Sequence, residues 1–447
     1  MHIVILGAGV VGFQIASQLI SEGKDVVMID NDPERAKHVS NHLDCIVLNE
    51  DGNNLVTLKR AGIERADFFI SVTNSDEVNM ISCGLVSSEF DVAIKIARVR
   101  NLDYSRAKIF EKTFLGIDFI VNSEVETARL IANTVEHGAS SEVMLFEKAK
   151  VQMRNLVVGS ASPFNGRNLL EIRKKINNPF LICGILRGDR VLIPGGYTII
   201  EENDIIYLLA DEKDFAALQK KIGVTEQKIE KVVIAGGGKI GALVASYLIE
   251  KNKKVTIIDD DYTSCKMLSE KFPEALILNS DISDESIFEE EQLFNYDLII
   301  AATDNQELNI LTSIFAKSLG TNRAVALIAK SNYLPIASRL GIDASVSPKI
   351  STVDAILKFI RRGNIKSVHS IFDGKAEVIE FSVEEKSSLS SKKIMDIELP
   401  PNSLLLSVIR GEETFIPDGQ FIIEPDDTII AIATKNSITQ LEDMFLS

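Results

Sequence analysis

Two short glycine loops have the residue spacing that a phosphate-binding turn requires. The first loop follows a short apolar run and places glycine at Gly7, Gly9 and Gly12. The residues with the same spacing in the second loop are Gly236, Gly238 and Gly241. In this pattern the first glycine permits a tight turn, the second lets a pyrophosphate approach the backbone amides, and the third lets the following helix pack closely. Each loop therefore predicts a nucleotide site at the start of a helix.

An acidic residue follows each loop, eighteen positions after the loop's last glycine. These residues, Asp30 and Asp259, end the next apolar run along the chain. A carboxylate at that place can accept hydrogen bonds from both hydroxyls of a ribose, and its charge repels a 2′-phosphate. The pattern therefore favours NAD(H) or an adenine nucleotide over NADP(H). A Rossmann-type fold whose loop no longer binds a ligand is the alternative, and it stays open for both loops.

Further charged residues are expected near the same phosphates. Arg98 ends the run "KIAR" at the edge of a later strand, where its guanidinium can pair with phosphate oxygens. Its counterpart in the second copy is Lys330, in "LIAK", which offers a point charge without the planar fork. Asp51 and Asp281 follow the third expected strand and form a second acidic pair near the nucleotide edge. Solvated loop carboxylates are an equally good interpretation of that pair.

The second loop is part of a duplication that extends along the whole chain. The glycines and the acidic residue repeat at an offset of 229 residues, and 73–79 ("TNSDEVN") matches 303–309 ("TDNQELN") at an offset of 230. Beyond them, 185–204 matches 408–427 at an offset of 223. A slowly drifting offset indicates small insertions and deletions between two copies of one unit. Each copy is therefore expected to contain the same two parts.

The first part of each unit has the pattern of alternating strands and helices. Val11, Ile15 and Leu19 recur every four residues and predict a helix with one apolar face. Apolar strands between such helices predict a parallel sheet that is covered on both faces. The strands expected in the first copy are 2–6, 25–30, 44–49, 67–72 and 92–97. A helix at 123–138 is expected to lead out of this part.

The second part of each unit has a different pattern. Around 185–204, short β-rich runs are broken by Gly-Asp, Pro-Gly-Gly and Glu-Asn-Asp turns, which is typical of a small α+β domain. A charged segment at 219–232 is expected to link the two units. The predicted fold class is α/β, with two Rossmann-like parallel-sheet domains that are each followed by a small α+β domain. The expected boundaries are 1–140, 141–225, 230–365 and 366–447.

The composition of the chain restricts the classes of partner that it can bind and the cellular compartment in which we expect it. The chain of 447 residues has a formal net charge of −16, which argues against a nucleic-acid partner because phosphate backbones require clustered Lys and Arg. No apolar run approaches the roughly 20 residues that span a bilayer, and no signal peptide is recognisable, so we expect a cytoplasmic chain. Four scattered cysteines are expected to be buried and reduced: Cys45, Cys83, Cys183 and Cys265.

Groups for covalent or acid–base catalysis are harder to find. None of the five histidines repeats between the two units. His38 and His42 share one face of an expected helix, but the neighbouring residues supply no Glu base or further ligand, so an exposed helix face is the better interpretation. No nucleophile stands out beside a base, and the small domains lack the acid–base groups of a dehydrogenase substrate domain. We expect neither a metal site nor an enzyme, and a nicotinamide-dependent oxidoreductase is the rival class.

The tandem arrangement resembles the potassium-conductance regulator (RCK) domains over essentially the whole chain. The motifs that carry the resemblance are "GAGVVG", "MIDND", "VTNSDEVN", "KIARVRN", "FIVNSE", "GGGKIG" and "ELPPNSLLLSVIRG". The resemblance implies a cytoplasmic subunit that binds NAD(H) or ATP/ADP and gates a membrane potassium uptake transporter, with which it associates at the inner face of the membrane. It also implies a ring of eight such domains, and hence a homotetramer of tandem chains.

The resemblance also assigns the residues of two nucleotide sites. The first site comprises Gly7, Ala8, Gly9, Val10, Val11, Gly12, Asp30, Thr73, Asn74 and Arg98. The second comprises Gly236, Gly237, Gly238, Lys239, Ile240, Gly241, Asp259, Thr303 and Lys330. The second site departs from the first through Gly237 and Lys330, which puts its choice of nucleotide in doubt. Regulation of a potassium efflux system or channel stays open, because the transporter is a separate chain.

The replacement Asp30→Ala is expected to weaken the binding of nucleotides that carry a free ribose diol, because this carboxylate is the expected acceptor for both hydroxyls. Titration calorimetry of the unchanged chain and the variant with NADH and with ADP measures the effect. Equal affinities of the two proteins would remove the role assigned to Asp30.

Overall fold

The computed structural model divides the chain into two compact units. One unit joins Met1–Ala132 with Glu230–Ile360, and the other joins Asn133–Ile229 with Arg361–Ser447. Equivalent parts of the duplication therefore fold together, although they are far apart in the sequence. The residues that the structure describes are 1–106, 114–136, 143–146, 150–160, 162–176, 179–221, 229–360, 365–372, 375–385, 387 and 389–446.

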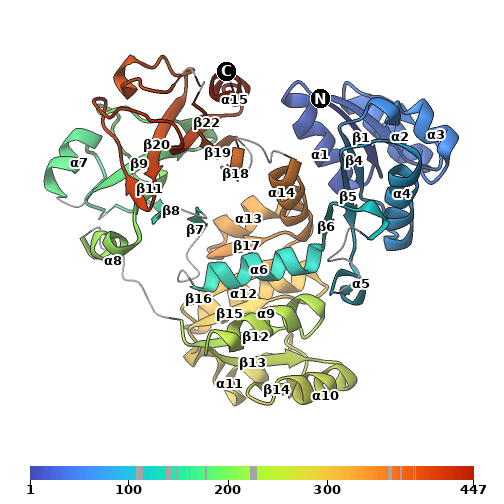
Figure 1. Cartoon of the computed structure of the whole chain (residues 1–447). Coiled ribbons are helices and arrows are strands. Elements are labelled where there is room, and N and C mark those ends of the chain that lie inside the picture. Colours follow the sequence, from blue (N-terminus) through green and yellow to red (C-terminus); the bar gives the residue numbers. More distant parts are fainter. Residues whose placement is uncertain are drawn as a thin grey trace. The chain divides into compact units, whose positions relative to one another are not determined.

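The first Rossmann half contains a parallel sheet with the strand order β3-β2-β1-β4-β5-β6. Figure 1 labels its strands β1, β4, β5 and β6. Its strands are β1 (His2–Leu6), β2 (Asp25–Ile29), β3 (Ile46–Leu48), β4 (Phe68–Ser71), β5 (Ile94–Arg98) and β6 (Phe119–Val121). Its helical elements are α1 (Val10–Ser21), α2 (Pro33–His42), α3 (Leu55–Arg60), η1 (Ile63–Arg65), α4 (Asp76–Glu89), α5 (Leu102–Arg106), η3 (Phe114–Gly116) and α6 (Ser123–Glu136). The five expected strands are confirmed, and β6 is an additional one. The helix expected at 123–138 is α6, and its last two expected residues lie outside the described ones.

The second Rossmann half repeats this sheet with the strand order β14-β13-β12-β15-β16-β17, again with parallel neighbours. Its strands are β12 (Lys231–Ala235), β13 (Lys254–Asp259), β14 (Leu276–Asn279), β15 (Leu298–Ala301), β16 (Arg323–Leu327) and β17 (Ala344–Val346). Its helical elements are α9 (Lys239–Glu250), α10 (Tyr262–Lys271), α11 (Ser286–Glu290), η4 (Leu293–Asn295), α12 (Gln306–Leu319), η5 (Ser331–Tyr333), α13 (Leu334–Arg339) and α14 (Pro348–Ile360).

Local sequence explains how these elements begin and why they stay buried. The Ser75 side chain accepts a hydrogen bond from the backbone N–H of Val78 and caps α4. Asn305 caps α12 in the same way through the N–H of Leu308. Strand residues such as Ile5 are fully buried because helices cover both faces of the sheet. The caps fix the start of the helices that follow β4 and β15, and with them the loops at the carboxyl edge of each sheet.

The last helix of the second Rossmann half belongs to the core of the first. Val353, Ile356 and Ile360 of α14 are buried in the same apolar cluster as the strand and helix residues of the first sheet. The rings of Phe119 in β6 and Phe359 in α14 stack with their centroids 4.3 Å apart. The two Rossmann halves are therefore interlocked within one unit and share a hydrophobic core.

The second unit contains two antiparallel sheets, with the strand orders β10-β9-β11-β8-β7 and β18-β19-β22-β20-β21. The first small domain is built from β7 (Val143–Leu145), β8 (Val151–Val157), α7 (Leu169–Lys175), β9 (Phe180–Arg187), β10 (Arg190–Leu192), β11 (Ile205–Asp211) and α8 (Glu212–Lys221). The second is built from β18 (Ile365–Ile371), β19 (Ala376–Ser382), η6 (Ile394–Asp396), β20 (Ser403–Arg410), β21 (Glu413–Phe415), β22 (Thr428–Thr434) and α15 (Ile438–Leu446). The predicted pair of small α+β domains is confirmed.

The segment expected to link the two units is partly regular structure. Its first residues belong to α8, which ends at Lys221, and its last two residues open β12, which begins at Lys231. Residues 222–228 lie outside the described part of the chain. The charged composition of 219–232 therefore made the expected linker too long, because exposed helix and strand ends are as rich in charge as a linker.

The structure shows how far the four cysteines are buried and whether a described helix could cross a bilayer. All four cysteines are free, and Cys83, Cys183 and Cys265 are buried while Cys45 is half-buried. Burial and the nearby Asp44 raise the pKa of Cys45 to about 11, so little thiolate is present at neutral pH. Across the described residues, no helix combines the length and the apolar character that a bilayer crossing requires.

Each small domain is tied together by the same ion-paired turn. The guanidinium of Arg187 donates to both carboxylate oxygens of Asp204, at 2.9 and 2.7 Å, and also pairs with Glu201 at 2.5 Å. The hydrogen bonds with Asp204 raise the pKa of Arg187. Arg410 and Asp427 repeat the arrangement at 2.8 Å in the second small domain. Because both aspartates are 1% exposed, each needs its arginine to compensate a buried charge.

The replacement Arg187→Ala is expected to lower the free energy of unfolding by about 3 kcal/mol, because it leaves the buried Asp204 without its cation. The matched control is Glu201→Gln, which alters the exposed partner of the same arginine and is expected to cost under about 1 kcal/mol. Urea denaturation followed by circular dichroism compares the two variants. Similar losses for both would show that the buried pair is not what stabilises the turn.

Candidate nucleotide-binding sites

The two glycine loops have the same backbone geometry. Gly7 has a φ of +109° and Gly236 a φ of +105°, a region that residues with a side chain rarely adopt. A Cβ atom on Gly12 would lie 1.9 Å from the carbonyl oxygen of Gly7, so the start of α1 packs against the loop only without a side chain there. A Cβ atom on Gly9 or on Gly238 would meet nothing within 4 Å. The space beside these two residues is therefore open to a ligand at a helix N-terminus, as a pyrophosphate requires.

The carboxylate of Asp30 holds the first loop in place. One of its oxygens accepts the N–H of Ala8 at 2.6 Å, and the other accepts the N–H of Asp32 at 2.9 Å. Asp30 is 6% exposed, so these backbone N–H groups, and not water, are the main partners of its charge. The sequence suggested only a role toward ribose, and this contact with the loop is an additional one. Each carboxylate oxygen keeps a second lone pair, which leaves the predicted bonds to ribose hydroxyls chemically possible.

The second loop has the same carboxylate contacts and a packing reason for its extra glycine. Asp259 accepts the N–H of Gly237 at 2.6 Å and that of Asp261 at 3.0 Å. A Cβ atom on Gly237 would lie 2.4 Å from a methyl carbon of Leu268. A side chain on Gly237, which stands where the first loop has Ala8, would therefore require Leu268 in α10 to move.

A buried asparagine, to which the sequence analysis assigned no role, joins the loop after β4 to the end of β5. The side-chain oxygen of Asn79 accepts the N–H and the hydroxyl of Thr73, at 2.8 and 2.7 Å. Its amide donates to the carbonyl oxygen of Arg98 at 2.8 Å. Asn309 repeats these bonds with Thr303. Its recurrence at the same place in both copies was the signal that could have identified it, because a buried amide with several partners fixes the loop around it.

These bonds correct the expected counterpart of Arg98. The amide of Asn309 donates to the carbonyl oxygen of Leu327 at 3.0 Å, so Leu327 occupies the place of Arg98 at the end of the equivalent strand. Arg98 pairs with Val121 in the sheet, and Leu327 pairs with Val346 in the same register. The correspondence between Arg98 and Lys330 is therefore wrong by three residues. The second site has no arginine at this position.

Lys330 itself lies in the loop beyond β16. Its backbone N–H donates to the side-chain oxygen of Gln306 at 2.9 Å, just as the N–H of Asn101 donates to Asp76 at 2.8 Å in the first half. Its ammonium group lies 3.5 Å from Glu307 on the surface. A contact of Lys330 with a nucleotide stays a prediction, made from a different position in the fold than Arg98.

Arg98 lies half-buried at the carboxyl edge of the first sheet. Its Nε donates to the hydroxyl of Ser123 at 3.0 Å. Burial and the neighbouring Arg100 lower its pKa, while Glu124 and Asp76 act in the opposite direction. Arginine nevertheless stays protonated at neutral pH, since its ordinary pKa lies far above neutrality. Its two terminal nitrogens have no partner among the described residues, so they are available to phosphate oxygens.

The remaining loop residues are exposed at the same edges. The carbonyl oxygen of Asn74 accepts a hydrogen bond from Arg100, and Asp51 accepts one from Asn31 at 2.9 Å. Asp281 accepts the N–H of Ser283 at 2.8 Å, and this bond lowers its pKa. The hydrogen bonds of these two carboxylates are thus with their own loops or with Asn31. Their part in nucleotide binding stays a prediction.

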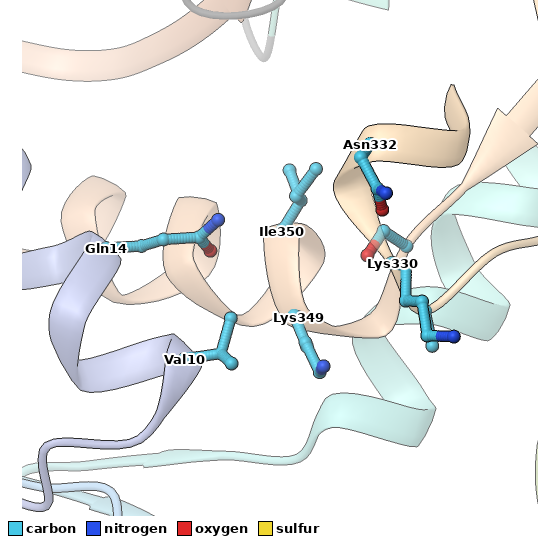
Figure 2. Close-up of a pocket in the computed structure, with 8 residues that line it drawn as sticks. Val10, Gln14, Lys330, Asn332, Lys349 and Ile350 are labelled. Carbon is cyan, nitrogen blue, oxygen red and sulfur yellow. The ribbon is translucent and has the colours of Figure 1, made fainter. Parts of the chain in front are cut away.

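A cavity of about 200 Å³ brings residues of both Rossmann halves together (Figure 2). Val10 and Gln14 of α1 form its wall in the first half. Lys330 and Asn332 beyond β16 and Lys349 in the first turn of α14 form its wall in the second. The side-chain oxygen of Gln14 is buried there without a hydrogen-bond partner among the described residues. The cavity therefore connects the helix of the first glycine loop with the carboxyl edge of the second sheet.

The chemistry that these sites offer is binding. Each glycine loop offers backbone amides beside a carboxylate, Arg98 lies at the edge of the first sheet, and Lys330 and Lys349 line the cavity. Groups of these kinds bind the phosphate and ribose groups of nucleotides in proteins. In the described part of the chain, no group of three or more His, Cys, Asp and Glu side chains could hold a metal ion. His38 and His42 instead stack on each other, with ring centroids 4.3 Å apart.

Two family models match the chain in duplicate. The TrkA-N domain model matches residues 3–123 and 232–348, and the TrkA-C domain model matches residues 153–223 and 378–446. The Trk system potassium uptake protein TrkA of Halomonas elongata is 32% identical over 451 residues, which cover 100% of this chain and 98% of that protein.

Solved structures resemble the whole chain at lower identity. The crystal structure of the GsuK RCK domain is 18% identical, with a TM-score of 0.59, and the match covers 100% of this chain and 95% of that one. The GsuK channel bound to NAD is 17% identical, with a TM-score of 0.58, and the match covers 100% and 79%. At such identities the likeness shows the fold alone.

The fold and the repeated loops define a tandem array of TrkA-N and TrkA-C domains, as the resemblance to RCK domains predicted. The match extends over the full length of the chain and of its relative. The chain belongs to the family of the Trk system potassium uptake proteins TrkA.

Proposed function

We propose that this chain is a cytoplasmic regulatory subunit that binds nucleotides at its two glycine loops and gates a membrane potassium uptake transporter. The observation that carries the proposal is the duplicated loop itself. In both copies a carboxylate holds the loop backbone, and the glycine at the helix N-terminus is open to an approaching phosphate. Membership of the TrkA family supports a role in potassium transport.

The ligands that fit best are NAD(H) and the adenine nucleotides ATP and ADP. Asp30 and Asp259 at the ends of their strands disfavour a 2′-phosphate because of their charge. A neighbour of the same fold is a channel bound to NAD, which supports NAD as a ligand of such loops. The first site has Arg98 at its edge and the second has Leu327, so the two sites are expected to differ in affinity.

Regulation requires that nucleotide binding favour one conformation of the assembly over another. A ligand with equal affinity for two states shifts neither, so each nucleotide must bind them unequally, with a coupling of about 1–3 kcal/mol. The proposed assembly is a homotetramer, whose tandem chains close a ring of RCK domains. Its proposed partner is a TrkH/TrkG-like transporter subunit at the inner face of the cell membrane.

Two alternatives have distinct consequences. An NAD-dependent oxidoreductase would oxidise bound NADH when offered 2-oxo acids or aldehydes, and steady turnover above background would favour it. A regulator of potassium efflux or of a channel would bind the same nucleotides at the same two sites. It would differ from an uptake regulator only in its membrane partner, which can be identified by co-purification with this chain.

The replacement Gly9→Asp is expected to abolish the response of potassium flux to nucleotide exchange, because it places a carboxylate where the pyrophosphate approaches the first loop. Flux is measured in liposomes that contain both the chain and its transporter. The matched control is Gly159→Asp, which adds the same carboxylate in the first small domain, outside the glycine loops, where a Cβ atom also meets nothing within 4 Å. A full response from folded Gly9→Asp protein would exclude the first site as the sensor, and Gly238→Asp tests the second site in the same way.

A further inference from the structure

A pair of hydroxyl groups, one from each Rossmann half, holds Arg98. The Nε of Arg98 donates to the Ser123 hydroxyl at 3.0 Å, and the hydroxyl oxygen of Thr352 lies 2.8 Å from that of Ser123. Ser123 is 4% exposed and Thr352 is fully buried, so solvent does not compete for these bonds. The contact joins the start of α6 to α14 across 229 residues of sequence.

We propose that Thr352 is a positioning residue of the first nucleotide site, supplied by the second half of the chain. Through Ser123 it fixes the direction in which the Arg98 guanidinium presents its terminal nitrogens to a phosphate of the bound nucleotide. The inference rests on the proposed function, because it takes that phosphate as the partner of Arg98.

The hydrogen-bond roles in this group are limited by the number of protons. Arg98 Nε can only donate, and each hydroxyl carries one proton. Thr352 lies 2.7 Å from the carbonyl oxygen of Pro348, which can only accept. Thr352 Oγ1 is the donor toward Ser123 Oγ as well, so its single proton serves either the Ser123 hydroxyl or the Pro348 carbonyl oxygen. In both cases Thr352 lies against the hydroxyl that accepts from Arg98, and this contact holds Ser123 and, through it, the arginine.

The duplication shows that the contact is specific to the first site. Thr127 occupies the fifth position of α6, as Thr352 does in α14, and both are fully buried. The hydroxyl of Thr127 bonds to the carbonyl oxygen of Ser123 within its own helix, at 2.5 Å. In the second half Pro348 stands where the first has Ser123, and Leu327 stands where it has Arg98. The second half therefore lacks both the serine hydroxyl and the arginine guanidinium, as expected if the hydroxyl serves to position the guanidinium.

The anchored Nε leaves the functional end of the arginine free. Both terminal nitrogens of Arg98 lack a partner among the described residues, so its fork can meet phosphate oxygens in a bidentate manner. An arginine held in advance loses less rotamer freedom on binding than one that is mobile. Thr352 is therefore expected to affect nucleotide affinity without touching the nucleotide.

Nucleotide titrations of the full-length chain test the inference, with ADP as the probe and Gly238→Asp present throughout to silence the second site. Thr352→Val keeps the shape of the side chain but removes its hydroxyl, and it is expected to weaken ADP binding about fivefold, as the loss of one hydrogen bond predicts. Thr352→Ser is expected to restore the affinity to within about twofold. The matched control Thr127→Val removes the equivalent buried hydroxyl and is expected to leave the affinity unchanged.

A double-mutant cycle separates positioning from a structural effect. Arg98→Lys keeps the charge but has no Nε–H at that place, so Thr352→Val is expected to cause no further loss in its background. A fivefold loss that persists there, or an unchanged affinity of Thr352→Val, would overturn the inference while leaving the proposed function intact. If Thr352→Val does not fold, Ser123→Ala replaces it in the same cycle. Failure of the Gly238→Asp parent to bind ADP would contradict nucleotide binding at the first site itself, and with it this inference.

Discussion

The burial of α14 against the first Rossmann sheet is the interaction on which the geometry of both sites depends. This helix is amphipathic, and its apolar face, with Val353, Ile356 and Ile360, lies in the core of the other half of the chain. Burying one such side chain contributes roughly 1.5–3 kcal/mol, so separating the halves would expose several such contributions at once. The same helix brings Thr352 to Ser123 and Lys349 to the cavity beside Val10. One packing arrangement therefore places residues of the second half beside the first site.

Duplication with divergence accounts for the differences between the sites. The glycine loop and its carboxylate are kept in both copies, with loop N–H contacts of 2.6 Å in each. The polar groups at the carboxyl edge of the first sheet are not kept, since Arg98 and Ser123 give way to Leu327 and Pro348. Under the proposed function, two sites with the same turn and different polar surroundings would receive two different nucleotide inputs. A coupling between them through α14 is part of that proposal, since α14 contacts Ser123 and lines the cavity beside Val10.

The extent to which sequence predicted the structure follows from the range of the forces involved. The glycine loops and five strands of the first sheet depend on neighbouring residues and could be predicted, whereas β6 was not expected, although it is as long as β3, which was. The register of Arg98 and Lys330 was predicted wrongly because "KIAR" and "LIAK" look alike. The repeat offset of 229 residues already pointed from Arg98 to Leu327, and the partners of Asn79 and Asn309 decide between the two. The amphipathic pattern of α14 predicts that one face of the helix is buried against another element, but it does not predict which of the two sheets that is. The contact of Thr352 with Ser123 was hidden for the same reason.

Amide hydrogen exchange of the replacement Ile356→Ala tests most directly whether the two Rossmann halves form one unit. Ile356 is fully buried in α14, and the truncation is expected to cost about 2–5 kcal/mol. If α14 completes the first core, protection will fall in β1 and α1, more than 300 residues away in sequence, as well as in α14. Loss of protection that is confined to α14 and the second sheet, with β1 and α1 unchanged, would contradict the interlocked core and the proposed coupling between sites that rests on it.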